Sequence, residues 1–98
     1  MYVIRDVFRC KPGKSRQVAE LFKAALPGFE KAKILTHGRI LLDAVTDYWT
    51  VILEAEVENL GEYERQMEEY GKRDELRKTM IGYVDLVEGG RREIYRVV

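Results

Sequence analysis

Four runs of β-forming residues, interleaved with two segments of helical periodicity, limit this chain to a small number of folds. The β-forming runs cover residues 2–10, 32–45, 48–57 and 91–98, and the helical segments cover residues 15–26 and 60–88. Strands repeat every two residues and helices every 3.6, so the two types are separable by pattern. The order of the segments predicts an α+β fold of split β-α-β type, with a four-stranded antiparallel sheet and both helical regions on one face.

The residues between and within the segments predict where elements begin, bend and end. Pro27-Gly28 is expected to end the first helix. Asn59 and Glu62 have the spacing of a capping box, which predicts the start of the second helical region. Gly71 is expected to break that region into two pieces, and Gly38 inside the second strand indicates a bulge or a bend.

Charge and cysteine content narrow the class of protein. The chain has 98 residues, a length typical of one domain over 1–98, with 17 basic and 17 acidic residues that cancel. A neutral chain lacks the electropositive surface of a nucleic-acid-binding protein and has no general attraction to anionic membranes. Cys10 has no partner for a disulfide, and we find no signal peptide and no apolar run of about 20 residues. These features predict a cytoplasmic protein.

The face of the sheet away from the helices is expected to be too apolar to remain in water. A solvated sheet face should carry polar residues. Here the expected face includes several apolar residues among its charges: Val3, Val7, Leu35, Leu41, Val45, Tyr48 and Ile52. A second copy related by two-fold symmetry would cover them, which predicts a homodimer formed sheet to sheet. The alternative is a monomer with scattered exposed apolar residues.

The chain resembles NIPSNAP-like proteins, members of the dimeric α+β-barrel superfamily, over essentially its whole length. The opening strand runs into Phe8-Arg9-Cys10-Lys11-Pro12-Gly13-Lys14 and a helix, as theirs does. The close is also similar, with a helix that runs into Asp85-Leu86-Val87-Glu88-Gly89-Gly90-Arg91-Arg92-Glu93-Ile94-Tyr95. The resemblance implies ferredoxin-like halves packed sheet to sheet, with one pocket per protomer between helices and sheet.

The relatives do not determine an activity, because a shared fold is not a shared function. NIPSNAP-like proteins have no agreed activity. Other members of the superfamily include antibiotic-biosynthesis-type, cofactor-independent quinol and haem-degrading monooxygenases, as well as effector-binding modules. The haem-degrading enzymes carry their iron-ligating histidine on the second helical region, and residues 60–88 of this chain contain no histidine.

Asp6 is the candidate catalytic residue. It alternates in phase with Ile4 and Phe8, so its carboxylate is expected to point toward the pocket under the helices. A buried carboxylate is costly unless it is paired, and its pKa can rise into a range that suits proton transfer. The alternative is that Asp6 pairs with a nearby arginine of the fold. Arg91 and Arg92 form a basic pair before the last strand, for which a solvated surface position is expected.

Four further residues are candidates for ligand binding. Trp49 begins the apolar phase of the third strand and is able to stack on a planar ligand, while Tyr63, Met67 and Tyr83 share the inner side of the second helical region. For each of them, packing in the core is the alternative role.

His37 is the only histidine, and it has no neighbouring cysteine or histidine. The sequence therefore predicts no metal site and no cofactor. His37 itself is expected on the surface or at the proposed interface.

Three functional hypotheses follow. The first is a binding protein that holds a small apolar or aromatic ligand in a pocket between sheet and helices. The second is a cofactor-independent monooxygenase or isomerase that uses Asp6 and pocket tyrosines to deprotonate a quinol-like or aromatic substrate. The third is a structural or interaction protein whose role depends on the dimer.

Overall fold

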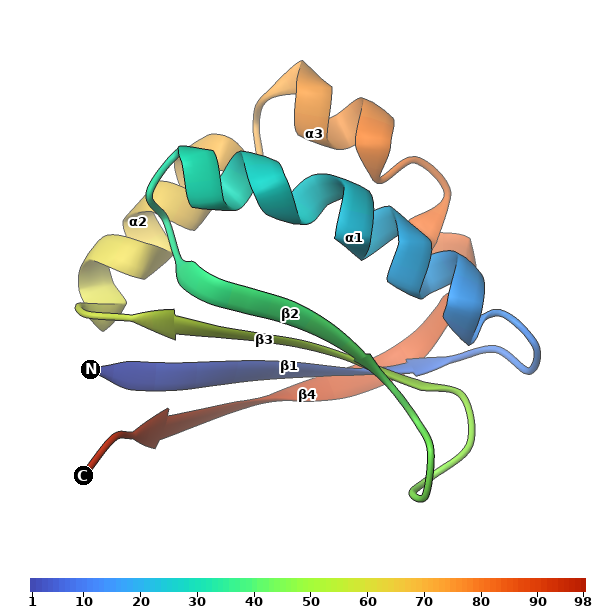
Figure 1. The fold of residues 1–98 in the computed structure, drawn as a ribbon. Coiled ribbons are helices and arrows are strands. Elements are labelled where there is room, and N and C mark those ends of the chain that lie inside the picture. The colour runs from blue at the N-terminus through green and yellow to red at the C-terminus, as the bar shows by residue number, and fades with distance from the viewer.

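The computed structural model describes residues 1–98 and places all helices on one face of a single antiparallel sheet (Figure 1). The elements follow in the order β1 (Tyr2–Cys10), α1 (Ser15–Lys31), β2 (Thr36–Leu42), β3 (Thr50–Val57), α2 (Leu60–Tyr70), α3 (Asp74–Thr79), the short 3₁₀ helix η1 (Tyr83–Asp85) and β4 (Val87–Arg96). The strands lie in the order β2-β3-β1-β4. This is the ferredoxin-like architecture that the sequence predicted.

The core lies between the helices and the alternate residues of the two central strands. On β1, Ile4 and Cys10 are each 2% exposed, and on β3 Val51 is fully buried. Helix α1 contributes Val18 and Phe22 to the same side. The amphipathic spacing of α1 and the alternation of β1 therefore act together to place the core.

Helix α1 continues beyond the predicted stop at Pro27-Gly28 and ends at Lys31, so that prediction was wrong. Proline removes one helical hydrogen bond and usually breaks the helix interior. Here the additional turn buries Phe29, whose ring centroid lies 4.8 Å from that of Tyr70. A Cβ atom on Gly28 would overlap the Tyr70 hydroxyl, so the glycine permits this close approach. Tertiary packing thus outweighs the local stop signal.

The second helical region begins and breaks as predicted. The Asn59 side chain accepts a hydrogen bond from the Glu62 amide at 2.9 Å, which caps α2. Helix α2 ends at Tyr70 with Gly71 as its C-cap, and α3 begins at Asp74. The bulge expected at Gly38 is also present, as a register shift between Thr36 and Arg39.

The last strand begins at Val87, four residues before the predicted start, and it runs through Gly89 and Gly90. The glycine pair was expected to separate a helix from this strand. Instead Gly90 lies so close to the Val7 carbonyl that a Cβ atom would overlap it. A residue without a side chain is therefore what allows β4 to pair along the whole of β1.

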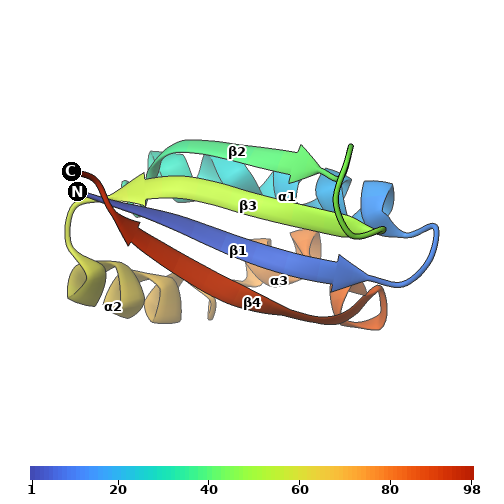
Figure 2. The same ribbon diagram turned by 90° about the horizontal axis from the view of Figure 1, so that it is seen from below.

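The face of the sheet opposite the helices is uncovered in the single chain (Figures 1 and 2). Val3, Val7, Leu41 and Ile52 lie on it, because Val7 is opposite Ile52 and Ile52 is opposite Leu41 in the strand register. Charged residues surround them, and Glu54 pairs with two arginines: Arg5 at 3.0 Å and Arg39 at 2.7 Å.

Three residues expected on this face lie elsewhere. Leu35 precedes β2 and is 3% exposed in the core. Val45 and Tyr48 are 98% and 82% exposed in the connection between β2 and β3, outside both strands. Strands β2 and β3 are shorter than predicted, which removes these residues from the sheet. The connection projects on the side away from the helices (Figure 1).

None of the helices combines the length and the apolar composition that a membrane span requires.

Candidate functional site

A cleft of about 490 Å³ opens between the β1–β4 half of the sheet and the segment that contains α2 and η1. Strand β1 contributes Asp6 and Phe8, and Met67 and Tyr83 come from the helical side. The remaining lining residues are Val7, Val87, Gly89, Gly90, Arg91 and Arg92. The cleft therefore lies where β1 and β4 meet the α2–η1 segment.

The cleft is open because the helices do not cover β4. Helix α1 lies behind β2 and β3, whereas α2 lies beyond the β4 edge (Figure 2). Ile94 is opposite the core residue Ile4 in the strand register, yet it is 43% exposed. The helix-facing side of β4 is consequently accessible to a ligand.

Asp6 and Arg92 form a bidentate ion pair at one end of the cleft. The two residues are opposite each other on β1 and β4. Arg92 Nε donates to Asp6 Oδ1 at 2.5 Å, and Arg92 Nη2 donates to Asp6 Oδ2 at 3.2 Å. The hydrogen bond to Asp6 raises the pKa of Arg92 above its ordinary value. Both carboxylate oxygens accept hydrogen bonds from Arg92, so Asp6 has the arginine partner that was its alternative role.

Tyr63 lies next to this ion pair without lining the cleft. The Arg92 guanidinium carbon is 6.0 Å from the centroid of the Tyr63 ring. Burial raises the pKa of Tyr63, and the negative charge of Asp6 raises it further, while Arg92 has the opposite effect. The phenol therefore stays protonated at neutral pH and is a hydrogen-bond donor rather than a base.

The apolar wall of the cleft is built from aromatic residues packed on one another. The rings of Phe8 and Phe22 have centroids 4.7 Å apart, and Phe22 is 6.0 Å from Tyr83. Phe22 is buried, which fixes the two rings that line the cleft. Met67 adds a flexible, polarisable side chain to this wall.

Trp49 is separated from the other candidates. It precedes β3, has a left-handed backbone (φ 62°) and is 38% exposed. Its carbonyl accepts a hydrogen bond from the Cys10 amide at 2.8 Å. The expectation that Trp49 extends the apolar face of the third strand was wrong, because the left-handed residue ends the alternation. Trp49 lines a different cleft at the start of α1.

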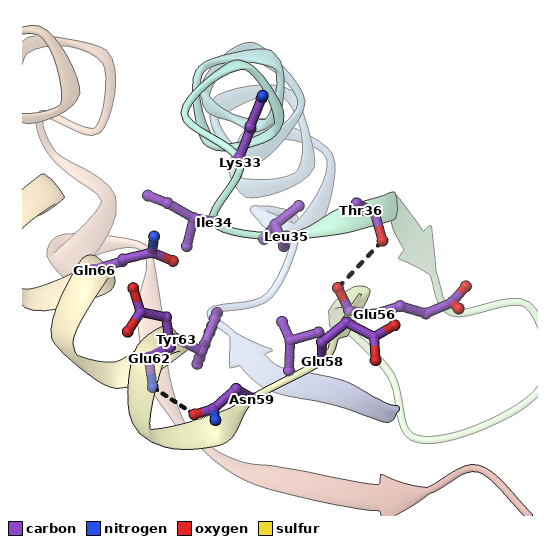
Figure 3. A pocket seen from close by; sticks show the side chains of 11 residues that line it. Lys33, Ile34, Leu35, Thr36, Glu56, Glu58, Asn59, Glu62, Tyr63 and Gln66 are labelled. Carbon is purple, nitrogen blue, oxygen red and sulfur yellow. Dashed lines mark hydrogen bonds between the residues drawn. The ribbon is translucent and has the colours of Figure 1, made fainter.

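A second cavity, of about 200 Å³, lies where the end of β3 meets the start of α2 (Figure 3). Ile34, Leu35 and Tyr63 contribute apolar lining. Figure 3 shows acidic side chains around it: Glu56, Glu58 and Glu62. This cavity is smaller than the cleft, and its acidic surroundings are unlike the apolar pocket expected from the sequence.

Sequence reasoning missed the role of Arg92, which was expected in solvent. A signal was present, since pairing the first and last strands antiparallel can place an acidic residue opposite one of the two arginines. The register that selects Arg92 is set by contacts between residues 86 positions apart, and no local pattern encodes it.

No group of three or more histidine, cysteine or acidic side chains is arranged to hold a metal ion. His37 is 76% exposed at its side chain and lies 3.2 Å from Glu56.

No protein-family model matches the sequence, and no curated protein matches it either. Solved structures, in contrast, match over nearly the whole chain. A NIPSNAP family protein from Agrobacterium tumefaciens has a TM-score of 0.81 at 14% identity, covering 99% of this chain and 92% of that one. An uncharacterised NIPSNAP domain protein from Burkholderia xenovorans has a TM-score of 0.77 at 12% identity, covering 100% and 95%.

A candidate antibiotic biosynthesis monooxygenase from Deinococcus radiodurans is also similar, with a TM-score of 0.72 at 9% identity, covering 100% of this chain and 93% of that one. The chain is thus an α+β protein of ferredoxin-like fold with an open cleft between helices and sheet. More particularly, it has the fold of NIPSNAP-domain proteins, as the sequence resemblance implied. Identities this low establish a common fold and no common activity.

Proposed function

We propose that this protein binds a small apolar or aromatic ligand that carries a polar group, in the cleft between β1, β4 and the α2–η1 segment. The observation that supports this function is the composition of the cleft, in which an aromatic wall ends at the Asp6–Arg92 ion pair. Ligand sites are typically mainly apolar, with a few fixed polar groups that orient the ligand.

The ion pair is suited to orient a ligand because Arg92 retains unused donors. A guanidinium has five N–H groups, and Asp6 accepts from two of the Arg92 nitrogens. The Arg92 side chain is 47% exposed, so its remaining N–H groups are able to donate to a hydroxyl or carbonyl oxygen of a ligand. The apolar part of the ligand would then lie against Phe8, Met67 and Tyr83.

The homodimer is part of the proposal. Val3, Val7, Leu41 and Ile52 form an apolar strip on the uncovered sheet face, and a second copy is the partner that two-fold symmetry provides. Charged residues beside the strip, such as Arg5 and Glu54, would set the register of the two sheets. A single domain over 1–98 and a cytoplasmic location stay predictions of the sequence.

Ligand binding in the cleft is tested by NMR on protein with ¹³C-labelled methionine methyl groups. The chain has three methionines, of which Met67 lines the cleft and Met1 does not. We expect the Met67 signal to shift saturably with one or more of hydroquinone, 1-naphthol and indole, while the Met1 signal stays fixed. If none of the compounds shifts the Met67 signal, the proposal is contradicted.

Matched variants locate the binding. Met67→Gln keeps the length of the side chain but makes the wall polar, so thermal stabilisation by the same compound should be lost. Glu68→Gln, on the next position of α2, is exposed and should retain it. Equal stabilisation of both variants would place binding outside the cleft.

The oxygenase alternative requires Asp6 to accept a proton, but both of its oxygens already accept from Arg92. No observation favours it over binding. We expect no oxygen uptake with a quinol panel, and uptake that is lost in Asp6→Ala would replace the binding function with this one. Two observations together would favour the structural or interaction role. They are partner proteins that co-purify with this chain and a cleft that binds none of the compounds.

A further inference from the structure

A second cleft lies at the opposite end of the molecule from the acidic cavity, at the beginning of α1. It has a volume of about 420 Å³ and is lined by Gly13, Ser15, Arg16, Leu42, Asp43 and Trp49. None of these residues lines the cleft of the proposed function, so the two sites are independent.

The long helix α1 begins here without a side-chain cap. The helix has 17 residues, its N-cap residue Lys14 makes no side-chain capping hydrogen bond, and its first turn contains no acidic residue. The Val18 amide donates to the Lys14 carbonyl at 3.1 Å, which leaves the amides of residues 15–17 without helical acceptors. Such an end carries partial positive charge and unpaired donors, both of which attract anions.

Ser15 provides a second, independent indication of a ligand. The residue is 8% exposed, yet its hydroxyl makes no hydrogen bond with the protein, although side chains this buried are normally paired. Ser15 lines the cleft, and its hydroxyl is not sealed from solvent. An oxygen of a bound anion would be its acceptor.

The remaining walls indicate what else the ligand carries. Arg16 is exposed and has no carboxylate partner. Trp49 and Leu42 are 38% and 39% exposed, and they present apolar surface beside the cationic end. Asp43 has the opposite charge, and its Oδ1 accepts from the Thr50 amide at 3.0 Å. The Asp43 carboxylate weakens the attraction for an anion, but it does not cancel the positive charge of the helix end and of Arg16 together.

We propose that this cleft binds a small organic anion whose oxyanion contacts the α1 N-terminus, Ser15 and Arg16, and whose flat apolar part lies on Trp49. The class includes aryl phosphates and aromatic carboxylates. Both present oxygen acceptors to the helix end and a ring to the indole.

The test uses phenyl phosphate and benzoate as probes, with inorganic phosphate and benzyl alcohol as partial ligands. Trp49 is the only tryptophan, so the intrinsic indole fluorescence of the intact protein reports on this cleft directly. We expect a saturable change with at least one of the two aromatic anions. Inorganic phosphate and benzyl alcohol should each bind at least about tenfold more weakly, because each lacks half of the interactions.

Three variants assign the contacts. Ser15→Ala and Arg16→Gln should each weaken binding by about three- to tenfold, the net range of one hydrogen bond that solvent can partly replace. Asp43→Asn should strengthen binding, since it removes the opposing charge and keeps an acceptor for the Thr50 amide. Lys23→Gln removes an exposed positive charge of α1 outside this cleft and should change binding little.

Several results would overturn the site. They are the absence of saturable binding, equal weakening by Lys23→Gln and Arg16→Gln, and inorganic phosphate binding as tightly as phenyl phosphate. Met67→Gln should leave these titrations unchanged, which separates failure here from failure of the proposed function.

Discussion

The ion pair of Asp6 and Arg92 is the polar element that joins the first and last strands of the sheet. Asp6 is 9% exposed, and its partner is about half exposed at the side chain. Removal of one partner from a buried pair leaves an uncompensated charge, whereas solvent at the Arg92 end reduces that penalty. The pair therefore contributes to stability and to the shape of the cleft together.

We predict that Asp6→Asn lowers the free energy of unfolding by about 1 kcal/mol, because one end of the pair reaches solvent. Urea unfolding of Asp6→Asn, Arg92→Gln and the double variant gives the coupling between the two residues. The matched cycle on Arg91 and Glu93, an ion pair of 2.8 Å two positions apart on β4, should show weaker coupling because its side chains are more exposed, 65% and 23% against 47% and 12% for Arg92 and Asp6. Equal coupling in both cycles would contradict the role given to Asp6.

Ionisation of Tyr63 makes the stability of the fold depend on pH in the alkaline range. Burial raises its pKa above that of a free tyrosine, so between the two values the folded state retains a proton that the unfolded state loses. Stability from this group is complete below pH about 10 and is lost as the pH rises toward the folded-state pKa.

We predict that Tyr63→Phe loses less stability than the unaltered protein between neutral pH and pH about 10–11, where free tyrosine titrates. Urea unfolding at a series of pH values measures the difference. The Cys10 thiol, whose pKa is also raised by burial, contributes alkaline sensitivity to both proteins and cancels in the comparison. Parallel curves for the two proteins would show that Tyr63 is not the titrating group.

Helix α1 shows how packing extends an element beyond its local stop signal. Pro27 lies inside the helix, and the turn that follows it carries Phe29 into the core beside Tyr70. The absence of a side chain at Gly28 makes room for the Tyr70 hydroxyl. The end of α1 and the end of α2 are thus fitted to each other.

We predict that Gly28→Ala destabilises the protein by about 1–3 kcal/mol, although alanine favours helices, because its methyl group overlaps the Tyr70 hydroxyl. Tyr70→Phe in the same chain removes that oxygen and should restore most of the loss. Thermal unfolding measures both. As a control, Gly61→Ala has its nearest contact at 3.5 Å and should be neutral or stabilising. Destabilisation that persists in the Gly28→Ala, Tyr70→Phe double variant would exclude the steric explanation.

At the scale of the whole molecule, the sheet has one covered and one uncovered face, and the uncovered face is only partly polar. Val7 is already buried at 8% exposure, but Val3, Leu41 and Ile52 remain partly exposed in the single chain, and no layer covers this side of the sheet. Sheets in small proteins normally bury one apolar face, and a second apolar strip indicates an interface.

We predict a particle of twice the 11.5 kDa chain mass at micromolar concentration, measured by size-exclusion chromatography with light scattering. Ile52→Lys places a charge in the centre of the strip and should give the single-chain mass. Val84→Lys, at a 72% exposed position of η1 outside the strip, should leave the mass unchanged. A single-chain mass for the unaltered protein would contradict the dimer.

The sequence by itself determined the order and type of the elements, the extent of β1, the cap at Asn59 and the break at Gly71. Each of these depends on residues a few positions apart, through side-chain alternation, helical spacing or a capping hydrogen bond. Only the tertiary structure decided that α1 continues past Pro27, that Asp6 selects Arg92, and that Trp49 lies at the start of α1 instead of in the main cleft. Those outcomes depend on strand register and on packing between distant segments. The residues that make these contacts are far apart in the sequence, so no local pattern relates them.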